Sequence, residues 1–345
     1  MTTTEGLRDT VVPFTAGDGR KLNLVHVEGE RPPTRGPVLL VHGAGVRADI
    51  FRAPVPTTIV DALVTKGYDV WLENWRASID VEASSWTLDQ AAVYDHPFAV
   101  QTVLDQSGAS DLQAIVHCQG STSFAMSAAA GLVPEVRTIV TNAVSLHPVL
   151  PAWSVVKIRA VAPWLGRLTP YLDPSWGLRA DTALAKAITA FVRLFHRECD
   201  NTVCRMVSFT YGAGFPALWS HANLNEATHN WLRHEFAQVP FSFFGQMARS
   251  VRHGAMVSMG HPSLPERFDD GPPQTDARFV FLAGADNHCF LAESQERSFA
   301  FLDRHRPGHH ALHVVPGYGH LDMFMGRDAG RDVFPLILDE LEHGS

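Results

Sequence analysis

The sequence predicts an α/β protein with a mostly parallel central sheet and helices on both faces. Apolar runs alternate with helical patterns over the first 150 residues, and this alternation returns at residue 277. Between 151 and 265 it stops, and the chain becomes rich in tryptophan, histidine, phenylalanine and helix formers. We therefore expect residues 1–150 and 266–345 to form the core, and residues 151–265 to be an inserted helical cap.

The composition is that of an ordinary globular protein and excludes several classes. The 345 residues are 46% hydrophobic and 19% charged, which does not fit a disordered chain. A net charge of −8 argues against a basic face for nucleic acid. The N-terminus lacks the basic start and the apolar core of a signal peptide, and no apolar run is long enough to span a membrane. We expect a soluble, cytoplasmic protein with reduced thiols. Its oligomeric state, a homodimer included, stays open.

Each core element is predicted from its periodicity and its turn residues. Residues 11–30 alternate around Gly17, Asp18 and Gly19, which predicts a β-hairpin. The expected parallel strands cover 38–41, 68–75, 113–117, 136–144, 277–284 and 311–315. The expected helices cover 57–66, 89–106, 121–132, 291–304 and 329–343. Strand and helix thus alternate through most of the core, as parallel pairing requires.

Cys118 is the candidate nucleophile because it lies directly between an apolar strand and a helix. This is the setting of a nucleophile elbow, a sharp turn that exposes a reactive side chain. Gly120 and Ser121 supply small residues on the helix side, whereas Val116 stands where a glycine is usual on the strand side. The helix N-terminus would stabilise a thiolate. The alternative is a buried, unreactive cysteine, which is common.

A glycine-rich loop, His42-Gly43-Ala44-Gly45, follows the first expected parallel strand. Next to a nucleophile elbow, such a loop donates one backbone N–H to a developing oxyanion, and the residue after the nucleophile donates another. We therefore predict an oxyanion hole made by the backbone N–H groups of Ala44 and Gln119. A plain glycine turn after a strand is the alternative.

Asp286 is the expected catalytic acid because it follows the strand over 277–284. A carboxylate at that strand end can orient an imidazole. The acid could instead lie at the end of the strand that follows the elbow. That strand ends at Asn142, which is not a carboxylate, and this favours Asp286 as the acid. Its rivals are Asp269, Asp270 and Asp322.

His320 is the expected base because it lies in a glycine-rich loop after the last strand, where it can reach across the strand ends. With Cys118 and Asp286 it gives the chain order nucleophile, acid, histidine. The chain has 18 histidines, so only this context singles His320 out. Other histidines near candidate loops are His42, His117, His288 and His309.

The expected pocket combines residues near the strand ends with aromatic and histidine side chains of the cap. These residues are His42, Trp75, His117, Trp153, Tyr211 and His221. For the aromatic residues of the cap, packing within the cap itself is the alternative. Cys199 and Cys204 lack a second close pair of ligands, and adding His196 gives no sharp metal motif. We therefore expect no metal site and no cofactor.

Together these motifs resemble the α/β-hydrolase superfamily over residues 36–150 and 277–343. The motifs are Leu-Val-His42-Gly-Ala-Gly, Gly67-Tyr-Asp-Val-Trp-Leu-Glu-Asn-Trp-Arg76, His117-Cys-Gln-Gly-Ser and Gly319-His320-Leu-Asp-Met-Phe-Met-Gly. The Tyr-Asp-Val-Trp-Leu segment is similar to acid lipases, and the Trp-Arg ending with the cysteine elbow to polyhydroxyalkanoate synthases. The chain also resembles the hydrolase-like domain attached to cholesterol-oxidase-type flavoproteins, and the stretch 221–229 is part of this resemblance. It lacks a dinucleotide-binding G-x-G-x-x-G.

The resemblance implies acyl chemistry through a cysteine. Acid lipases use serine where this chain has Cys118, whereas the synthases hold their acyl group as a thioester. We expect Cys118 to attack a small-molecule or carrier-bound ester or thioester, with His320 moving the proton and Asp286 orienting His320. The S-acyl group would then pass to water or to an alcohol or amine acceptor. The alternatives are a catalytically silent ligand- or partner-binding protein, and carbon–carbon bond chemistry through a cysteine adduct.

Overall fold

An eight-stranded sheet forms the centre of the computed structural model, which describes residues 6–212 and 217–343. The strand order is β1-β2-β4-β3-β5-β6-β9-β10. The strands are β1 (Arg8–Thr15), β2 (Lys21–Glu28), β3 (Pro37–Val41), β4 (Asp69–Asn74), β5 (Leu112–His117), β6 (Val136–Asn142), β9 (Arg278–Gly284) and β10 (Ala311–Val315). The β1–β2 and β2–β4 pairs are antiparallel, and every other pair is parallel. The predicted mostly parallel sheet is confirmed.

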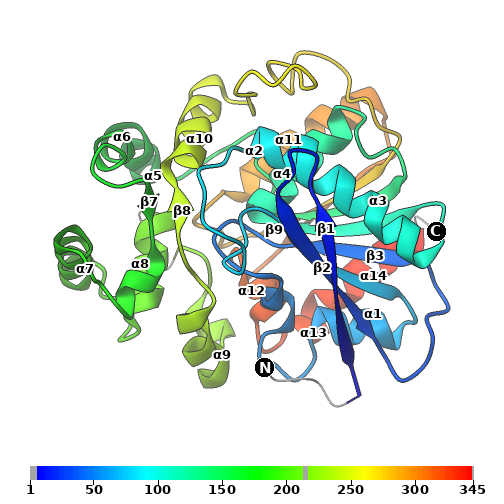
Figure 1. Ribbon diagram of the computed structural model, residues 1–345, viewed down its shortest axis with the longest axis horizontal. Coiled ribbons are helices and arrows are strands. Elements are labelled where there is room, and N and C mark those ends of the chain that lie inside the picture. Colours follow the sequence, from blue (N-terminus) through cyan, green and yellow to red (C-terminus); the bar gives the residue numbers. More distant parts are fainter. Residues whose placement is uncertain (1–5, 213–216, 344–345) are drawn as a thin grey trace.

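Helices cover both faces of this sheet. The core helices are α1 (Ile59–Thr65), α2 (Leu88–Gln90), α3 (His96–Ser107), α4 (Cys118–Ala129), α11 (Ala292–His305), α12 (Asp322–Met325), α13 (Ala329–Asp332) and α14 (Phe334–His343). Two short turns accompany them: η1 (Ala48–Arg52) lies between β3 and α1, and η2 (Ala91–Asp95) lies between α2 and α3. Helices α1 and α14 pack together, as do α3 and α4 (Figure 1).

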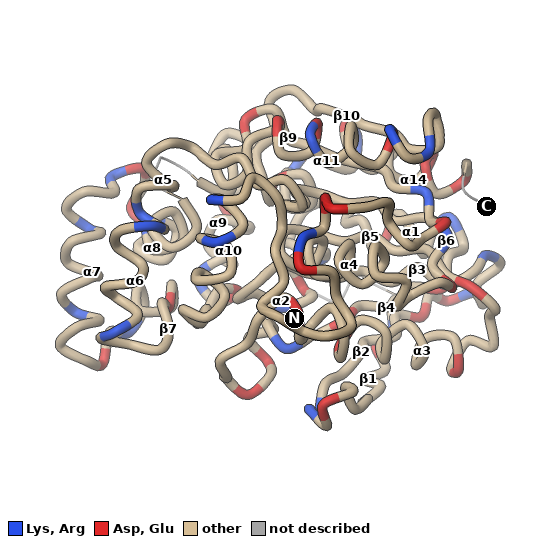
Figure 2. Tube along the Cα trace, turned by 90° about the horizontal axis from the view of Figure 1, so that it is seen from above, with Lys and Arg blue, Asp and Glu red and all other residues tan. Residues whose placement is uncertain are grey.

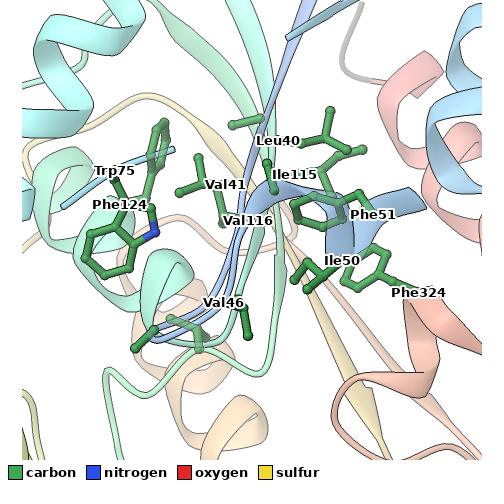
Figure 3. Packing of buried hydrophobic residues seen from close by; sticks show 14 of the residues in the cluster. Leu40, Val41, Val46, Ile50, Phe51, Trp75, Ile115, Val116, Phe124 and Phe324 are labelled. Carbon is green, nitrogen blue, oxygen red and sulfur yellow. The ribbon is translucent and has the colours of Figure 1, made fainter. Parts of the chain in front are cut away.

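The core is a closely packed apolar layer on each side of the sheet. Strands β3 and β5 are fully buried, as expected for central parallel strands. Figure 3 shows Trp75 and Phe124 on one side of these strands, and Ile50, Phe51 and Phe324 on the other. The rings of Phe51 and Phe324 meet edge to face at 5.0 Å. Both layers support the carboxyl ends of β3 and β5, where the candidate site lies.

Two expected helices are interrupted, and proline accounts for both breaks. The helix expected over 89–106 contains the π-turn η2 and restarts at α3, with Pro97 in its first turn. The helix expected over 329–343 divides at Val333, and Pro335 lies in the first turn of α14. Proline has no N–H for the preceding turn and is tolerated only near a helix start. A third helix, α4, begins at Cys118 and not at 121.

The segment 151–265, which we call the cap, lies beside the core in Figure 1 and consists mainly of short helices. Its helices and turns are α5 (Ala152–Val156), η3 (Lys157–Val161), α6 (Ala162–Leu165), η4 (Pro174–Gly177), α7 (Ala183–Phe195), α8 (Thr202–Tyr211), η5 (His221–Asn223), α9 (Glu226–Trp231), η6 (Leu232–His234) and α10 (Phe241–His253). Within the described part of the chain, its strands β7 (Tyr171–Leu172) and β8 (Val239–Pro240) pair with each other and with no other strand.

Charged residues of both signs are interspersed along the core and the cap (Figure 2). Among the described residues, no helix is long and apolar enough to cross a membrane.

Candidate active site

Cys118 lies at a sharp turn between β5 and α4. Its φ of 55° is in the left-handed region, which a non-glycine residue adopts only where the fold forces it. Ser121 and Thr122 donate side-chain hydrogen bonds to the Cys118 carbonyl, at 2.7 Å and 3.3 Å, and so fix the first turn of α4. This is the backbone geometry of a nucleophile elbow, and it forms despite Val116 on the strand side.

Two glycines make room for the elbow. A Cβ on Gly120 would lie 2.1 Å from the His42 carbonyl oxygen, and a Cβ on Gly43 would lie 2.9 Å from the Cys118 Cβ. Because real Cβ atoms do not approach this closely, only glycine lets the elbow pack against the end of β3. The loop after β3 and the start of α4 are thereby held together.

The backbone N–H groups of Ala44 and Gln119 face the Cys118 sulfur, as an oxyanion hole requires. Both hydrogen bond to the sulfur and lower the pKa of the thiol, but burial acts more strongly and raises that pKa to about 12. Cys118 is therefore a neutral thiol at pH 7. It needs a base to become a nucleophile.

The Ala44 loop is anchored by the cap. The Tyr211 hydroxyl donates a 2.7 Å hydrogen bond to the Ala44 carbonyl oxygen. The next residue, Gly45, accepts a 3.0 Å hydrogen bond from the Ala237 N–H and donates one of 3.0 Å to the Ala77 carbonyl. These contacts from both sides fix the direction of the Ala44 N–H.

His320 is completely buried beside the nucleophile. Ring nitrogens of His320 and His117 and the Cys118 sulfur all lie within 4.8 Å of one another. Nε2 of His320 is buried without a hydrogen-bond partner, and burial lowers the pKa of this imidazole to about 3. The structure therefore brings Cys118 and His320 together as predicted, with both groups uncharged.

The partner of His320 is Asn287 and not Asp286. The Asn287 side-chain nitrogen lies 3.1 Å from His320 Nδ1. Asp286 is exposed, and within the described residues no hydrogen bond joins its carboxylate to His320. The Asp286 N–H donates to the Tyr318 carbonyl at 2.9 Å. This bond turns the Asn287 side chain inward and the Asp286 side chain outward. Our expectation of an Asp286–His320 contact is thus corrected.

The rival carboxylates do not take the place of Asp286. Asp269 and Asp270 pair with Arg267 at 2.7 Å and 3.2 Å. Asp322 is buried and accepts a 2.8 Å hydrogen bond from the Gly319 N–H, so it shapes the loop that carries His320. Among the described residues, His320 has no carboxylate partner.

The remaining expected pocket residues divide into three groups. His42 and His117 are buried around the nucleophile, and Trp75 is a core residue whose Nε1 donates to the His42 carbonyl at 2.9 Å. Tyr211 lines a small, mainly apolar cavity of about 50 Å³ in the cap, whereas Trp153 is 75% exposed and lines an adjoining open groove. His221 contacts Cys204, not the nucleophile.

Sequence reasoning missed Asn287, Asn142 and Cys289. Asn142 donates one hydrogen bond to His117 Nδ1 and one to the His320 carbonyl, both at 3.0 Å. The Cys289 N–H holds the Asn287 side-chain oxygen at 2.9 Å. Asn142 is the last residue of β6 and Asn287 follows β9, so both lie at the carboxyl ends of the strands, as Cys118 does. Their position at the strand ends could have identified both asparagines, but only carboxylates were considered as partners of the histidine.

The sheet, the elbow and the glycine loop together define an α/β-hydrolase fold, and solved structures agree. The chain aligns over 98% of its length with a thermophilic esterase from Thermogutta terrifontis (TM-score 0.58, 14% identity, 99% of that chain). It aligns equally far with a monoacylglycerol lipase of Paleococcus ferrophilus (TM-score 0.57, 14% identity, 100% of that chain). At these identities the likeness shows the fold alone.

Curated relatives are distant and longer than this chain. Sterol esterase 2 of Saccharomyces cerevisiae is 27% identical over 122 residues, which are 30% of this chain and 23% of that protein. A probable lipase of Schizosaccharomyces pombe is 24% identical over 308 residues, 82% of this chain and 65% of that protein. The chain thus spans less than two thirds of either relative. No protein-family model matches it.

Proposed function

We propose that this protein is a cysteine-dependent acyl-transfer enzyme that acts on a carboxylic ester or thioester. The observation that carries the proposal is the convergence of the Ala44 and Gln119 N–H groups on the sulfur of Cys118. Donors placed there would hold the oxyanion formed when the sulfur attacks a carbonyl, and each is typically worth about 3 kcal/mol of the barrier. The esterase and lipase names of the relatives and structural neighbours agree with this chemistry.

The proposed reaction has two steps. Once the imidazole proton of His320 has moved to Nδ1, the Cys118 sulfur attacks the carbonyl carbon while its proton passes to Nε2 of His320, and the oxyanion forms between Ala44 and Gln119. The carbonyl re-forms, the bond to the leaving oxygen or sulfur breaks, and the leaving group takes the proton from His320. This gives S-acyl-Cys118. Water, an alcohol or an amine then attacks the thioester while His320 accepts its proton. The carbon–sulfur bond breaks, the acyl product leaves, and the Cys118 sulfur takes the proton back from His320.

The cap supplies a small apolar cavity, which would have to widen to hold the acyl part of the substrate. That cavity is lined mainly by aliphatic and aromatic side chains, and Tyr211 joins it to the Ala44 loop. One lysine, Lys157, lies at its wall and donates to the carbonyls of Phe209 and Gly212, and burial lowers the pKa of its amine to about 7. An apolar chain there would exclude water and favour transfer to an acceptor. The resemblance to flavoprotein-attached hydrolase domains stays a prediction.

A second function, a catalytically silent ligand-binding protein, is favoured by the polarity of the Asn287–His320 hydrogen bond. An amide N–H that donates to Nδ1 leaves the imidazole proton on Nε2, the nitrogen that must accept the thiol proton. A site fixed in that state would bind an ester and leave it intact.

Turnover measurements distinguish the two functions. Purified protein is mixed with acyl esters and acyl thioesters of increasing chain length, with and without an added alcohol or amine, and the products are separated by mass spectrometry. The acyl-transfer proposal expects product from wild type and none from Cys118→Ala. An absence of turnover across the whole series, while an apolar fluorescent fatty acid still binds, would overturn it in favour of the silent protein.

A further inference from the structure

Four side chains with metal-binding atoms meet in the cap, away from Cys118. Cys199 precedes α8, Cys204 lies in its first turn, His221 begins η5, and His229 lies in α9. One ligand atom of each lies within 4.8 Å of every other. From the sequence alone we considered Cys199, Cys204 and His196 and expected no metal site. His221 and His229 were not included, because these two histidines come from elements that only the fold of the cap brings to the cysteines.

The contacts among these four residues are those of a ligand set. His221 Nε2 lies 3.3 Å from the Cys204 sulfur. The side chains of Cys204, His221 and His229 all lie next to the Cys199 sulfur. The His221 and His229 rings meet edge to face at 5.1 Å, and Nε2 of His229 is buried with no hydrogen-bond partner. Both cysteines are free thiols, so no disulfide occupies them.

The spacing fits tetrahedral zinc. With Zn–S near 2.3 Å and Zn–N near 2.0–2.1 Å, four tetrahedral ligand atoms lie about 3.3–3.8 Å apart. The His221–Cys204 pair is already in that range, and the upper limit of 4.8 Å leaves only small side-chain movements to close the set. Two thiolates with two imidazoles in a tetrahedron are typical of zinc among divalent metals.

Neighbouring groups support the ligands as they do in metal sites. The Asn201 side-chain oxygen accepts from the N–H groups of Val203 and Cys204, at 3.1 Å and 3.2 Å, and so positions the Cys204 backbone. The Asn201 side-chain nitrogen donates to the His229 carbonyl at 2.8 Å. The buried Trp219 side chain lies near the Cys204 sulfur, and its indole N–H has no hydrogen-bond partner among the described residues. Such outer contacts orient ligands and stabilise thiolate charge.

We propose that Cys199, Cys204, His221 and His229 bind one zinc ion. With four protein ligands the ion has no open position for water, so its role is structural and not catalytic. This proposal does not depend on the reaction at Cys118.

The site would tie the cap to both loops around Cys118. Next to His221, the Ser220 N–H and the Asn223 side-chain nitrogen donate to Asp322, at 3.2 Å and 2.6 Å. Asp322 in turn holds the loop of His320. At the other end of α8, Tyr211 holds the Ala44 carbonyl. Zinc between α8, η5 and α9 would therefore fix the spacing of the oxyanion loop and the histidine loop.

Metal analysis of the untagged protein tests the proposal. The protein is purified under reducing conditions without chelator, and zinc is counted by mass spectrometry of the digested sample. We expect one zinc per chain, and X-ray absorption should show two sulfur ligands at about 2.3 Å and two nitrogen ligands at about 2.0–2.1 Å. Zinc should be lost in Cys204→Ser and in His229→Ala. Cys118→Ser is the matched control and should retain it, because Cys118 belongs to a separate cluster with His117 and His320.

Several outcomes would overturn the proposal. The first is a wild-type protein that stays below about a tenth of a zinc ion per chain after incubation with zinc and reductant. The second is an X-ray absorption spectrum that shows a number of sulfur ligands other than two. The third is a folded Cys204→Ser variant with the same zinc content as wild type. If the variants fail to fold, the wild type still decides. Cobalt titrated into metal-free wild type should give visible bands of tetrahedral cobalt with thiolate charge transfer, and their absence would contradict the site.

Discussion

The side chain of Asn287 donates a 3.1 Å hydrogen bond to Nδ1 of His320. The direction of the bond is set by the backbone, because the N–H groups of Cys289 and Phe290 both donate to the Asn287 oxygen, at 2.9 Å and 3.2 Å. Only the amide nitrogen is left to face the imidazole. The resting His320 therefore carries its proton on Nε2, and catalysis requires it to move to Nδ1.

Replacing Asn287 by Asp should raise the rate of Cys118 acylation. A carboxylate accepts a hydrogen bond from Nδ1, so it would favour the tautomer in which Nε2 can take the thiol proton. Since the wrong tautomer costs up to about 10⁴-fold in a serine triad, we expect a gain of about 10²-fold or more. Stopped-flow release of a chromogenic leaving group measures the acylation rate. Asp286→Asn, on the exposed neighbour, is the control and should leave the rate unchanged. A folded N287D variant no faster than wild type would contradict this account.

Tyr211→Phe should slow the reaction without unfolding the protein. The substitution removes the 2.7 Å hydrogen bond to Ala44 and lets the oxyanion loop shift. Loss of a whole oxyanion donor costs about 10²- to 10³-fold, so a displaced one should cost about 10-fold in kcat, with little change in KM. Tyr94→Phe, which removes a 2.9 Å bond to His261, is the matched control. Equal kcat values for the two variants would argue against this role of Tyr211.

Gly120→Ala should destabilise the fold by about 3 kcal/mol or more, because overpacking of a close contact is costly. The added Cβ would lie 2.1 Å from the His42 carbonyl oxygen and force β3 away from the elbow. Gly245→Ala in α10 is the control. Its Cβ meets nothing within 4 Å, and alanine in a helix should stabilise by about 0.5–1 kcal/mol. Urea unfolding measures both changes. A G120A protein as stable as wild type would show that the elbow is looser than described.

Stability should fall as the pH is lowered from about 6.5 toward 3. Burial lowers the pKa of His42 and His320 to about 3, and that of His310 to about 4, from a usual value of 6.5. In this pH range each of these histidines binds more protons in the unfolded chain than in the folded one, so their contribution to the free energy of unfolding rises with pH.

Urea unfolding between pH 7 and pH 4 checks this dependence. In His310→Asn the pH dependence of stability should be weaker, because one group with a lowered pKa is gone. A free energy of unfolding that is constant from pH 6.5 to pH 4.5 in wild type would contradict the prediction.

The strand ends were predictable because local sequence sets them. Glycines after β3 and small residues after Cys118 identify the oxyanion loop and the elbow without any tertiary information. The choice between Asp286 and Asn287 was not predictable in this way. Adjacent residues point in opposite directions, and the bond from the Asp286 N–H to Tyr318 decides which one turns inward.

The metal ligands show the same limit more strongly. Cys199 and Cys204 are close in the chain, but His221 and His229 join them only through the packing of α8, η5 and α9. A motif search that looks for four closely spaced ligands misses such a set. The cap, with short helices and no regular alternation, offers few local signals for how its elements meet.

Intact mass spectrometry after mixing with an activated acyl ester tests the central claim most directly. Cys289→Ala is included because Cys289 is a second buried thiol close enough to Cys118 for their charges to interact. We predict one acyl adduct on wild type and on Cys289→Ala, and none on Cys118→Ala. An adduct that persists in Cys118→Ala, or its absence from wild type across all esters tried, would contradict Cys118 as the nucleophile.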